Sequence, residues 1–133
     1  MTVKTIRKFN VAEDTTPQLG GELDAQAHSI GFTQQAITST SNEATIDWKA
    51  GNKAQLTLSE NITTFNFTAP SKPCSLLLKI IQDSTPRTIA WAGTVKWPAA
   101  TAPTLSIGSG DIDIVSFYYD GTNYYGTFSQ DFS

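Results

Sequence analysis

The chain has 133 residues, the length of one domain with at most an appended arm. Only 16% of its residues are charged and the formal net charge is −3, which argues against a nucleic-acid partner, because phosphate binding needs clustered cations and the one basic cluster is Lys4, Arg7 and Lys8. A single cysteine, Cys74, excludes an intramolecular disulfide, and no apolar run is long enough to span a membrane. This composition favours an all-β protein whose strands carry uncharged polar side chains.

Residues 1–42 differ from the rest of the chain, because their apolar residues are widely spaced and glycine and proline interrupt them. Such a segment has too few clustered apolar residues to form a core of its own. We therefore expect an extended N-terminal docking arm that ends in a linker at residues 38–42. A segment of this kind becomes ordered when it docks on a neighbouring subunit or a larger assembly. The expected docking residues are Lys4, Ile6, Arg7, Lys8, Phe9, Val11, Leu19 and Leu23.

From Glu43 onward, apolar and polar residues alternate with the period of two that is typical of β-strands. Ala54, Leu56 and Leu58, for example, alternate with polar residues. Residues 75–82 are apolar on both faces, which predicts a central strand covered on both sides. No sequence repeat is evident at a solenoid period. These patterns predict a β-domain over residues 43–133.

Two strand-like runs, residues 111–119 and 123–128, flank the turn sequence Asp120-Gly-Thr-Asn123 and predict a closing β-hairpin. The first run has apolar residues on both faces, so either a bulge interrupts it or both faces are covered. Short strands with turn signals at this spacing predict a compact antiparallel β-sandwich or barrel-like domain. Because neighbouring residues of a strand face opposite ways, one tyrosine of each adjacent pair is expected in the core.

Catalytic chemistry is not expected. The chain's one histidine, His28, lies in the arm, so no Ser–His–Asp or Cys–His arrangement has its base in the β-domain. Asp111 and Asp113 fall at i and i+2 on one strand face, near enough to interact, but they stand at a strand entrance where polar residues commonly face solvent. Together with Asp120 they are too few for a calcium site, and Asp120 is explained by the turn. We expect no enzyme, no metal and no cofactor.

Aromatic residues are the one class that supports a binding function. Aromatic rings stack on sugars, and exposed tyrosines supply contact area at interfaces with little entropy cost. The candidates for a subunit interface or a glycan contact are Trp97, Tyr119 and Tyr125.

Several phrases of the sequence resemble the β-modules of bacteriophage virion structural proteins, as found in tail fibres and capsid decoration proteins. The similarity covers about residues 43–133 and adds an upstream phrase, Pro17-Gln-Leu-Gly-Gly-Glu-Leu-Asp24. The phrases in the β-domain are Arg87-Thr-Ile-Ala-Trp91, Val95-Lys-Trp-Pro98, Ala102-Pro-Thr-Leu105 and Phe117-Tyr-Tyr-Asp-Gly-Thr-Asn-Tyr-Tyr-Gly126.

The resemblance implies a virion protein made in the cytoplasm of the bacterial host. Chain length favours a homotrimeric capsid decoration, or cement, protein that docks on the major capsid protein through its arm. The alternative is a small tail or head fibre subunit that recognises a host-surface glycan. A glycan depolymerase is a third possibility that lacks a credible acid–base pair. Neither nucleic acid nor a membrane is an expected partner.

Overall fold

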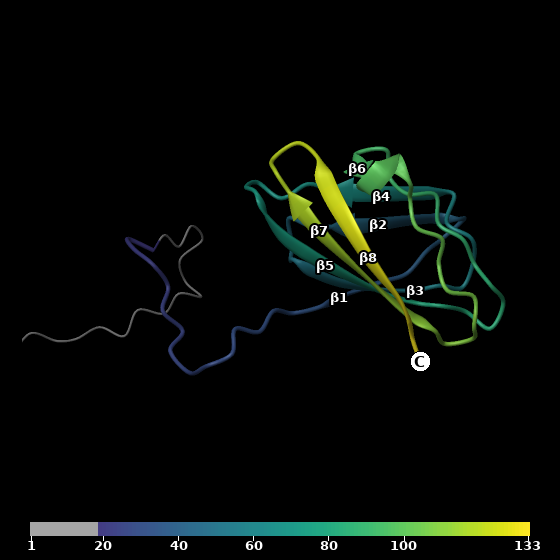
Figure 1. Ribbon diagram of the computed structural model, residues 1–133, viewed down its shortest axis with the longest axis horizontal. Coiled ribbons are helices and arrows are strands. Elements are labelled where there is room, and N and C mark those ends of the chain that lie inside the picture. The colour runs from purple at the N-terminus through teal and green to yellow at the C-terminus, as the bar shows by residue number, and fades with distance from the viewer. Residues whose placement is uncertain (1–18) are drawn as a thin grey trace, which may run out of the picture. The chain divides into compact units, whose positions relative to one another are not determined.

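The computed structural model describes residues 19–133 and divides the chain into two units, Met1–Gly31 and Phe32–Ser133. The second unit is all-β, which confirms the predicted fold class (Figure 1). Its strands are β1 (Gln35–Ile37), β2 (Glu43–Asp47), β3 (Lys53–Thr57), β4 (Thr64–Thr68), β5 (Cys74–Ile81), β6 (Val95–Lys96), β7 (Ile112–Tyr119) and β8 (Tyr124–Phe132), with a 3-10 turn, η2 (Pro98–Ala100), after β6.

The β-body begins earlier than the sequence indicated. Strand β1 lies within the stretch that was expected to be arm and linker, yet it pairs with β3 from Gln35 to Ile37. The compact unit accordingly starts at Phe32 and not at Glu43. Six of the expected docking residues, Lys4, Ile6, Arg7, Lys8, Phe9 and Val11, lie outside the described residues.

Two sheets enclose the core. The larger one has the strand order β1-β3-β5-β7-β8-β6 and curls around one side of the core, while β2 and β4 form a small sheet on the other side (Figure 1). Only β5–β7 and β7–β8 are antiparallel pairs, whereas β1–β3, β3–β5, β2–β4 and β6–β8 are parallel. The predicted antiparallel arrangement therefore holds for the second half of the domain alone.

The parallel pairs arise because the chain alternates between the sheets from β1 to β5. Each passage through both sheets is one coil, and the coils stack on one another. A third coil is completed after β5, where the amide nitrogen of Ala90 donates to the carbonyl oxygen of Ile62 (2.8 Å). The strands of the large sheet start at Gln35, Lys53 and Cys74, so the coils are unequal in length. That inequality hides the repeat from a search at one fixed period.

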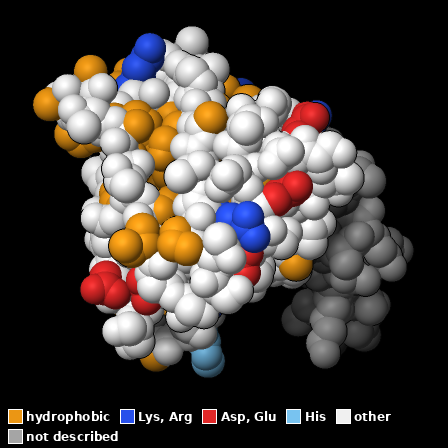
Figure 2. All heavy atoms as spheres, turned by 90° about the vertical axis from the view of Figure 1, so that its right-hand side faces the viewer, with side chains coloured by type: hydrophobic (Ala, Val, Ile, Leu, Met, Phe, Trp, Pro, Cys, Tyr) orange, Lys and Arg blue, Asp and Glu red, His pale blue; other side chains and the backbone are white. Residues whose placement is uncertain are grey.

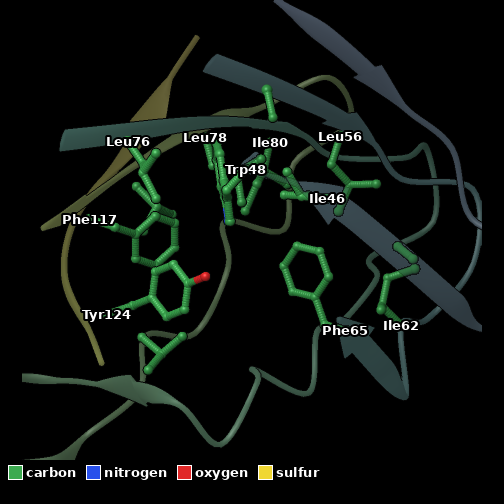
Figure 3. Packing of buried hydrophobic residues seen from close by; sticks show 14 of the residues in the cluster. Ile46, Trp48, Leu56, Ile62, Phe65, Leu76, Leu78, Ile80, Phe117 and Tyr124 are labelled. Carbon is green, nitrogen blue, oxygen red and sulfur yellow. The ribbon is translucent and has the colours of Figure 1, made fainter. Parts of the chain in front are cut away.

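The core lies between the inner faces of the two sheets (Figure 3). It follows from the alternation of apolar residues, since every second residue of β2, β3, β5 and β7 is buried. The largest fully buried side chains are Ile46, Leu56, Ile62, Leu78, Ile80 and Val115. The outer face of β5 is only half-buried, so the prediction of a strand covered on both sides is met on the inner side alone.

The C-terminal hairpin forms as predicted. Tyr119 pairs with Tyr124, and the turn between them is closed by the Asp120 carboxylate, whose Oδ1 accepts the N–H of Thr122 and of Asn123 (2.7 Å each). The expected irregularity is a register shift against β8 between Ile112 and Ile114. The outer face of β7 is half-buried at Ile112 and Ile114 and exposed at Ser116 and Tyr118, so the bulge is present and cover on both faces is not.

The long β5–β7 connection is held to the body by Gln82, which is 5% exposed. Its Nε2 donates to the carbonyl oxygens of Arg87 (3.1 Å) and Ser106 (2.7 Å). Its Oε1 accepts the N–H of Asp83 and of Arg87. Since all its polar atoms are bonded, this buried amide fixes both ends of the connection without a desolvation penalty. No helix in the described part of the chain is long and apolar enough to cross a membrane.

Two side-chain polar atoms of the core, Nε1 of Trp48 and the hydroxyl of Tyr124, have no hydrogen-bond partner within residues 19–133. The hydroxyl of Tyr124 is buried with no hydrogen-bond partner, and burial raises its pKa to about 12. We expect Tyr124→Phe to raise the free energy of unfolding by about 1 kcal/mol, because it removes an unpaired polar group and keeps the ring. Urea denaturation measures the change.

Tyr119→Phe is the matched control. Its ring packs on that of Tyr124 with centroids 4.6 Å apart, but its hydroxyl is not a buried unpaired group. The control should leave the urea midpoint unchanged. A Tyr124→Phe variant less stable than the wild type would show that this hydroxyl has a partner.

Candidate functional site

The outer face of the large sheet presents a cross-strand row of four residues. Ser75 on β5 pairs with Tyr118 on β7, Tyr118 pairs with Tyr125 on β8, and Tyr125 pairs with Lys96 on β6. These residues share one face because each pair is directly opposite across a ladder. We call the surface formed by this row and the next one the tyrosine face. The next row runs through Lys53, Leu77, Ser116 and Thr127.

The two tyrosines are the dominant feature of this face. Tyr118 is 55% exposed and Tyr125 is 47% exposed. Their rings stack across the two strands, with centroids 6.4 Å apart and planes inclined by 29°. Two nearly parallel, half-exposed rings present adjoining aromatic surface, which a flat apolar surface of a ligand can cover.

The hairpin turn orients Tyr125. The Asp120 carboxylate accepts the Tyr125 hydroxyl, and this hydrogen bond is the main reason that the pKa of Tyr125 is raised. Conversely, the pKa of Asp120 is lowered, first by the backbone N–H of Asn123 and then by that of Thr122. Asp120 is therefore ionised and Tyr125 protonated at neutral pH, so the ring is tethered at its hydroxyl end.

A hollow of about 650 Å³ adjoins the tyrosines. This volume is within the range of small-molecule sites, about 300–1,000 Å³. Its outer-face lining is mixed, with hydroxyl, amide, ammonium and apolar groups. Within the described residues, the side-chain oxygen of Asn52 in this lining is buried without a hydrogen-bond partner. The lining comprises Phe32, Asn52, Lys53, Ser75, Leu76, Leu77, Ser116, Phe117, Tyr118, Tyr125 and Thr127.

The charged groups on this side of the sheet are basic. Lys53 belongs to the second row, and Lys79 lies one row further, opposite Gln55 and Ile114. Neither lysine forms an ion pair within residues 19–133. Both are half-buried, so their stems lie along the sheet while the ammonium groups reach water.

Two of the three predicted aromatic contacts are placed elsewhere. Tyr119 is 5% exposed and belongs to the core, so it cannot contact a ligand in this chain. Trp97 is half-buried, because its ring packs edge-on against Trp91 with centroids 5.0 Å apart and covers Gly126. Trp97 lines a separate hollow of about 320 Å³, whereas Tyr125 lies on the tyrosine face.

Tyr118 was not among the aromatic residues predicted to contact a ligand. The turn register was a sufficient signal, since closing the hairpin at Asp120 and Asn123 puts Tyr118 opposite Tyr125. Lys53 and Asn52 had no such signal, because they reach this face through parallel pairing with a distant strand.

The carboxylate pair at the entrance of β7 serves the fold. Asp113 is 3% exposed and accepts the N–H and the hydroxyl of Ser106 (2.8 and 2.6 Å). Asp111 accepts the N–H of Gly108 at 2.6 Å and so closes a tight loop. Their bonds close the loop before β7, and neither carboxylate faces a cleft with the other. The described residues hold no group of three metal-ligating side chains.

The remaining reactive side chains stand apart. Burial raises the pKa of the half-buried Cys74 thiol, so the thiol stays protonated at neutral pH. His28 is exposed in the first unit, as expected for an arm residue. On the face that turns the β5–β7 connection to the viewer, charged side chains of both signs are scattered among apolar ones (Figure 2). That face offers no charge patch of one sign.

No protein-family model, curated protein or solved structure matches this chain.

Close packing of Trp97 on Gly126 is testable. A Cβ atom at residue 126 would lie 2.5 Å from Cζ3 of Trp97, which is closer than real contacts allow. Gly126→Ala should therefore lower the free energy of unfolding by about 1–3 kcal/mol through overpacking. It should also shift the tryptophan fluorescence, because the Trp97 ring must move towards solvent.

The double variant isolates the contact. In a Trp97→Ala background the added methyl group meets open space, so Gly126→Ala should then cost almost nothing. Equal costs in both backgrounds would contradict the packing that we describe.

Proposed function

We propose that this chain is a bacteriophage virion structural protein: a homotrimeric capsid decoration subunit that docks on the major capsid protein through its N-terminal segment. One observation supports docking most directly. In residues 19–31, which contain neither strand nor helix, Leu19 and Leu23 are 68% and 60% exposed. Large apolar side chains in a segment without a core are suited to burial against a partner.

The β-body is suited to be the folded part of such a protein that is exposed on the shell. It has its own core between two sheets, so it folds without help from the first unit. A subunit that binds several capsid proteins at once binds only the assembled shell. It therefore stabilises the shell by mass action, with no chemistry needed.

A fibre subunit that recognises a glycan is the second candidate. The exposed stack of Tyr118 on Tyr125 favours it. The two candidates differ in copy number, because decoration requires about as many copies as there are capsid sites, whereas fibres are few.

Quantitative mass spectrometry of purified virions tests the proposal. We expect a ratio to the major capsid protein that is near stoichiometric. A ratio below about one in twenty would exclude decoration, since so few copies cannot reinforce a shell by mass action. Absence from the virion would refute both candidates.

The docking role of the first unit makes a second prediction. Leu19→Ser together with Leu23→Ser should weaken binding to purified shells at least tenfold, because each buried leucine contributes about 2 kcal/mol. The β-body should keep its thermal midpoint, since both residues lie outside it. Ile107→Ser, which changes an exposed apolar residue of the β-body, is the control and should bind like the wild type. Unchanged binding of the double variant would contradict docking through these leucines.

A further inference from the structure

We propose that the tyrosine face is a binding site for an acidic saccharide, with Tyr118 and Tyr125 as the stacking platform and Lys53, Lys79 and Lys96 as the groups that meet the ligand's carboxylate. The inference concerns the β-body alone. It does not depend on where in a virion the chain is placed.

The platform selects a ligand with a flat apolar surface and a polar rim. The two stacked rings are about half exposed, and the Asp120 carboxylate tethers Tyr125. A pyranose ring has one such apolar face of C–H groups, ringed by hydroxyls. Stacking it on Tyr118 and Tyr125 removes both apolar surfaces from water.

Polar groups stand where the rim of such a ring would reach. Ser75 flanks Tyr118 in the same row, and Ser116 and Thr127 form the next row, about 7 Å along the strands. Their hydroxyls both donate and accept, as sugar hydroxyls do, so either orientation of the ring can be bonded. Asn52 lines the same hollow, with its side-chain oxygen buried.

Charge decides between neutral and acidic saccharides. Lys96 pairs with Tyr125 in the row of the tyrosines, and Lys53 and Lys79 stand one and two rows along the strands from it, in a chain whose net charge is −3. The three rows from Ser75 to Lys79 carry no carboxylate, and the one nearby, Asp120, lies beyond the tyrosines at the hairpin tip. Three ammonium groups on one face, without an ion pair in the described part of the chain, attract an anion, and a carboxylate bonded by lysine is a strong charge-assisted contact.

The same composition disfavours a second copy of this chain as the occupant. Buried centres of protein interfaces are depleted in lysine and serine. Here Lys53, Ser75 and Ser116 line the same hollow as the tyrosines. A copy placed on this face would bury these polar groups.

Binding of the purified full chain to an array of acidic and neutral bacterial polysaccharides tests the site, followed by calorimetry on the best acidic glycan and its neutral methyl ester. We expect the acidic form to bind more tightly. Tyr118→Ala and Tyr125→Ala should each weaken it about tenfold, the loss of one aromatic contact. Tyr118→Phe keeps the ring and should retain binding, and Ile107→Ala, which removes an exposed side chain elsewhere on the body, should have no effect.

Charge recognition has its own readout. Combining Lys53→Gln, Lys79→Gln and Lys96→Gln should bring the affinities for the acid and its methyl ester together and reduce the salt dependence of binding. Lys53 and Lys79 are half-buried on an outer sheet face, so circular dichroism is needed to check that the variant keeps the fold.

Three results would overturn the proposal. The first is that no acidic glycan binds above background. The second is that Tyr118→Ala and Tyr125→Ala both bind like the wild type. The third comes from light scattering: if the wild type is an oligomer that either alanine variant dissociates, the face is an interface between copies.

Discussion

Edge-to-face packing of Phe67 on Phe117 joins the two sheets, with ring centroids 5.6 Å apart, and the rest of the body depends on it. Trp48 and Tyr124 each pack on both of these rings, so the four aromatic side chains form one cluster between the sheets. A two-stranded sheet is only marginally stable alone. The small sheet of β2 and β4 therefore persists because this cluster holds it against the large one.

The same cluster decides what the outer surface presents. Burial of Phe117, Tyr119 and Tyr124 fixes the register of the β7–β8 hairpin, since a slip of one residue would turn the whole apolar set to solvent. With that register fixed, Tyr118 and Tyr125 must lie on the opposite, outer face of the sheet. The platform proposed for ligand binding is thus a by-product of core packing, and its position is as stable as the core itself.

The local sequence pattern predicted the features that neighbouring residues determine. Alternation gave the strands, and the turn residues gave the hairpin and the division of each tyrosine pair into an inner and an outer member. Pairing between distant strands could not be obtained in this way, because nothing in the residues 53–57 specifies that Lys53 lies beside Leu77. The parallel coils were missed for this reason, and so was the lysine side of the tyrosine face. The choice of Tyr119 as a contact residue was wrong. Alternation says that one tyrosine of each adjacent pair faces the core, but the register of the hairpin decides which one.

The stack of coils ends at strands β1 and β2, each of which pairs on one side only within the described residues. Because a coil touches only its neighbours, one more passage through the two sheets inserted ahead of Gln35 would add a strand to each sheet and disturb neither the aromatic cluster nor the hairpin. Body length is thus set at a single place in the chain, independently of the surface that β5, β7 and β8 display. The body can therefore lengthen or shorten by whole coils ahead of Gln35 while the opposite end keeps its shape.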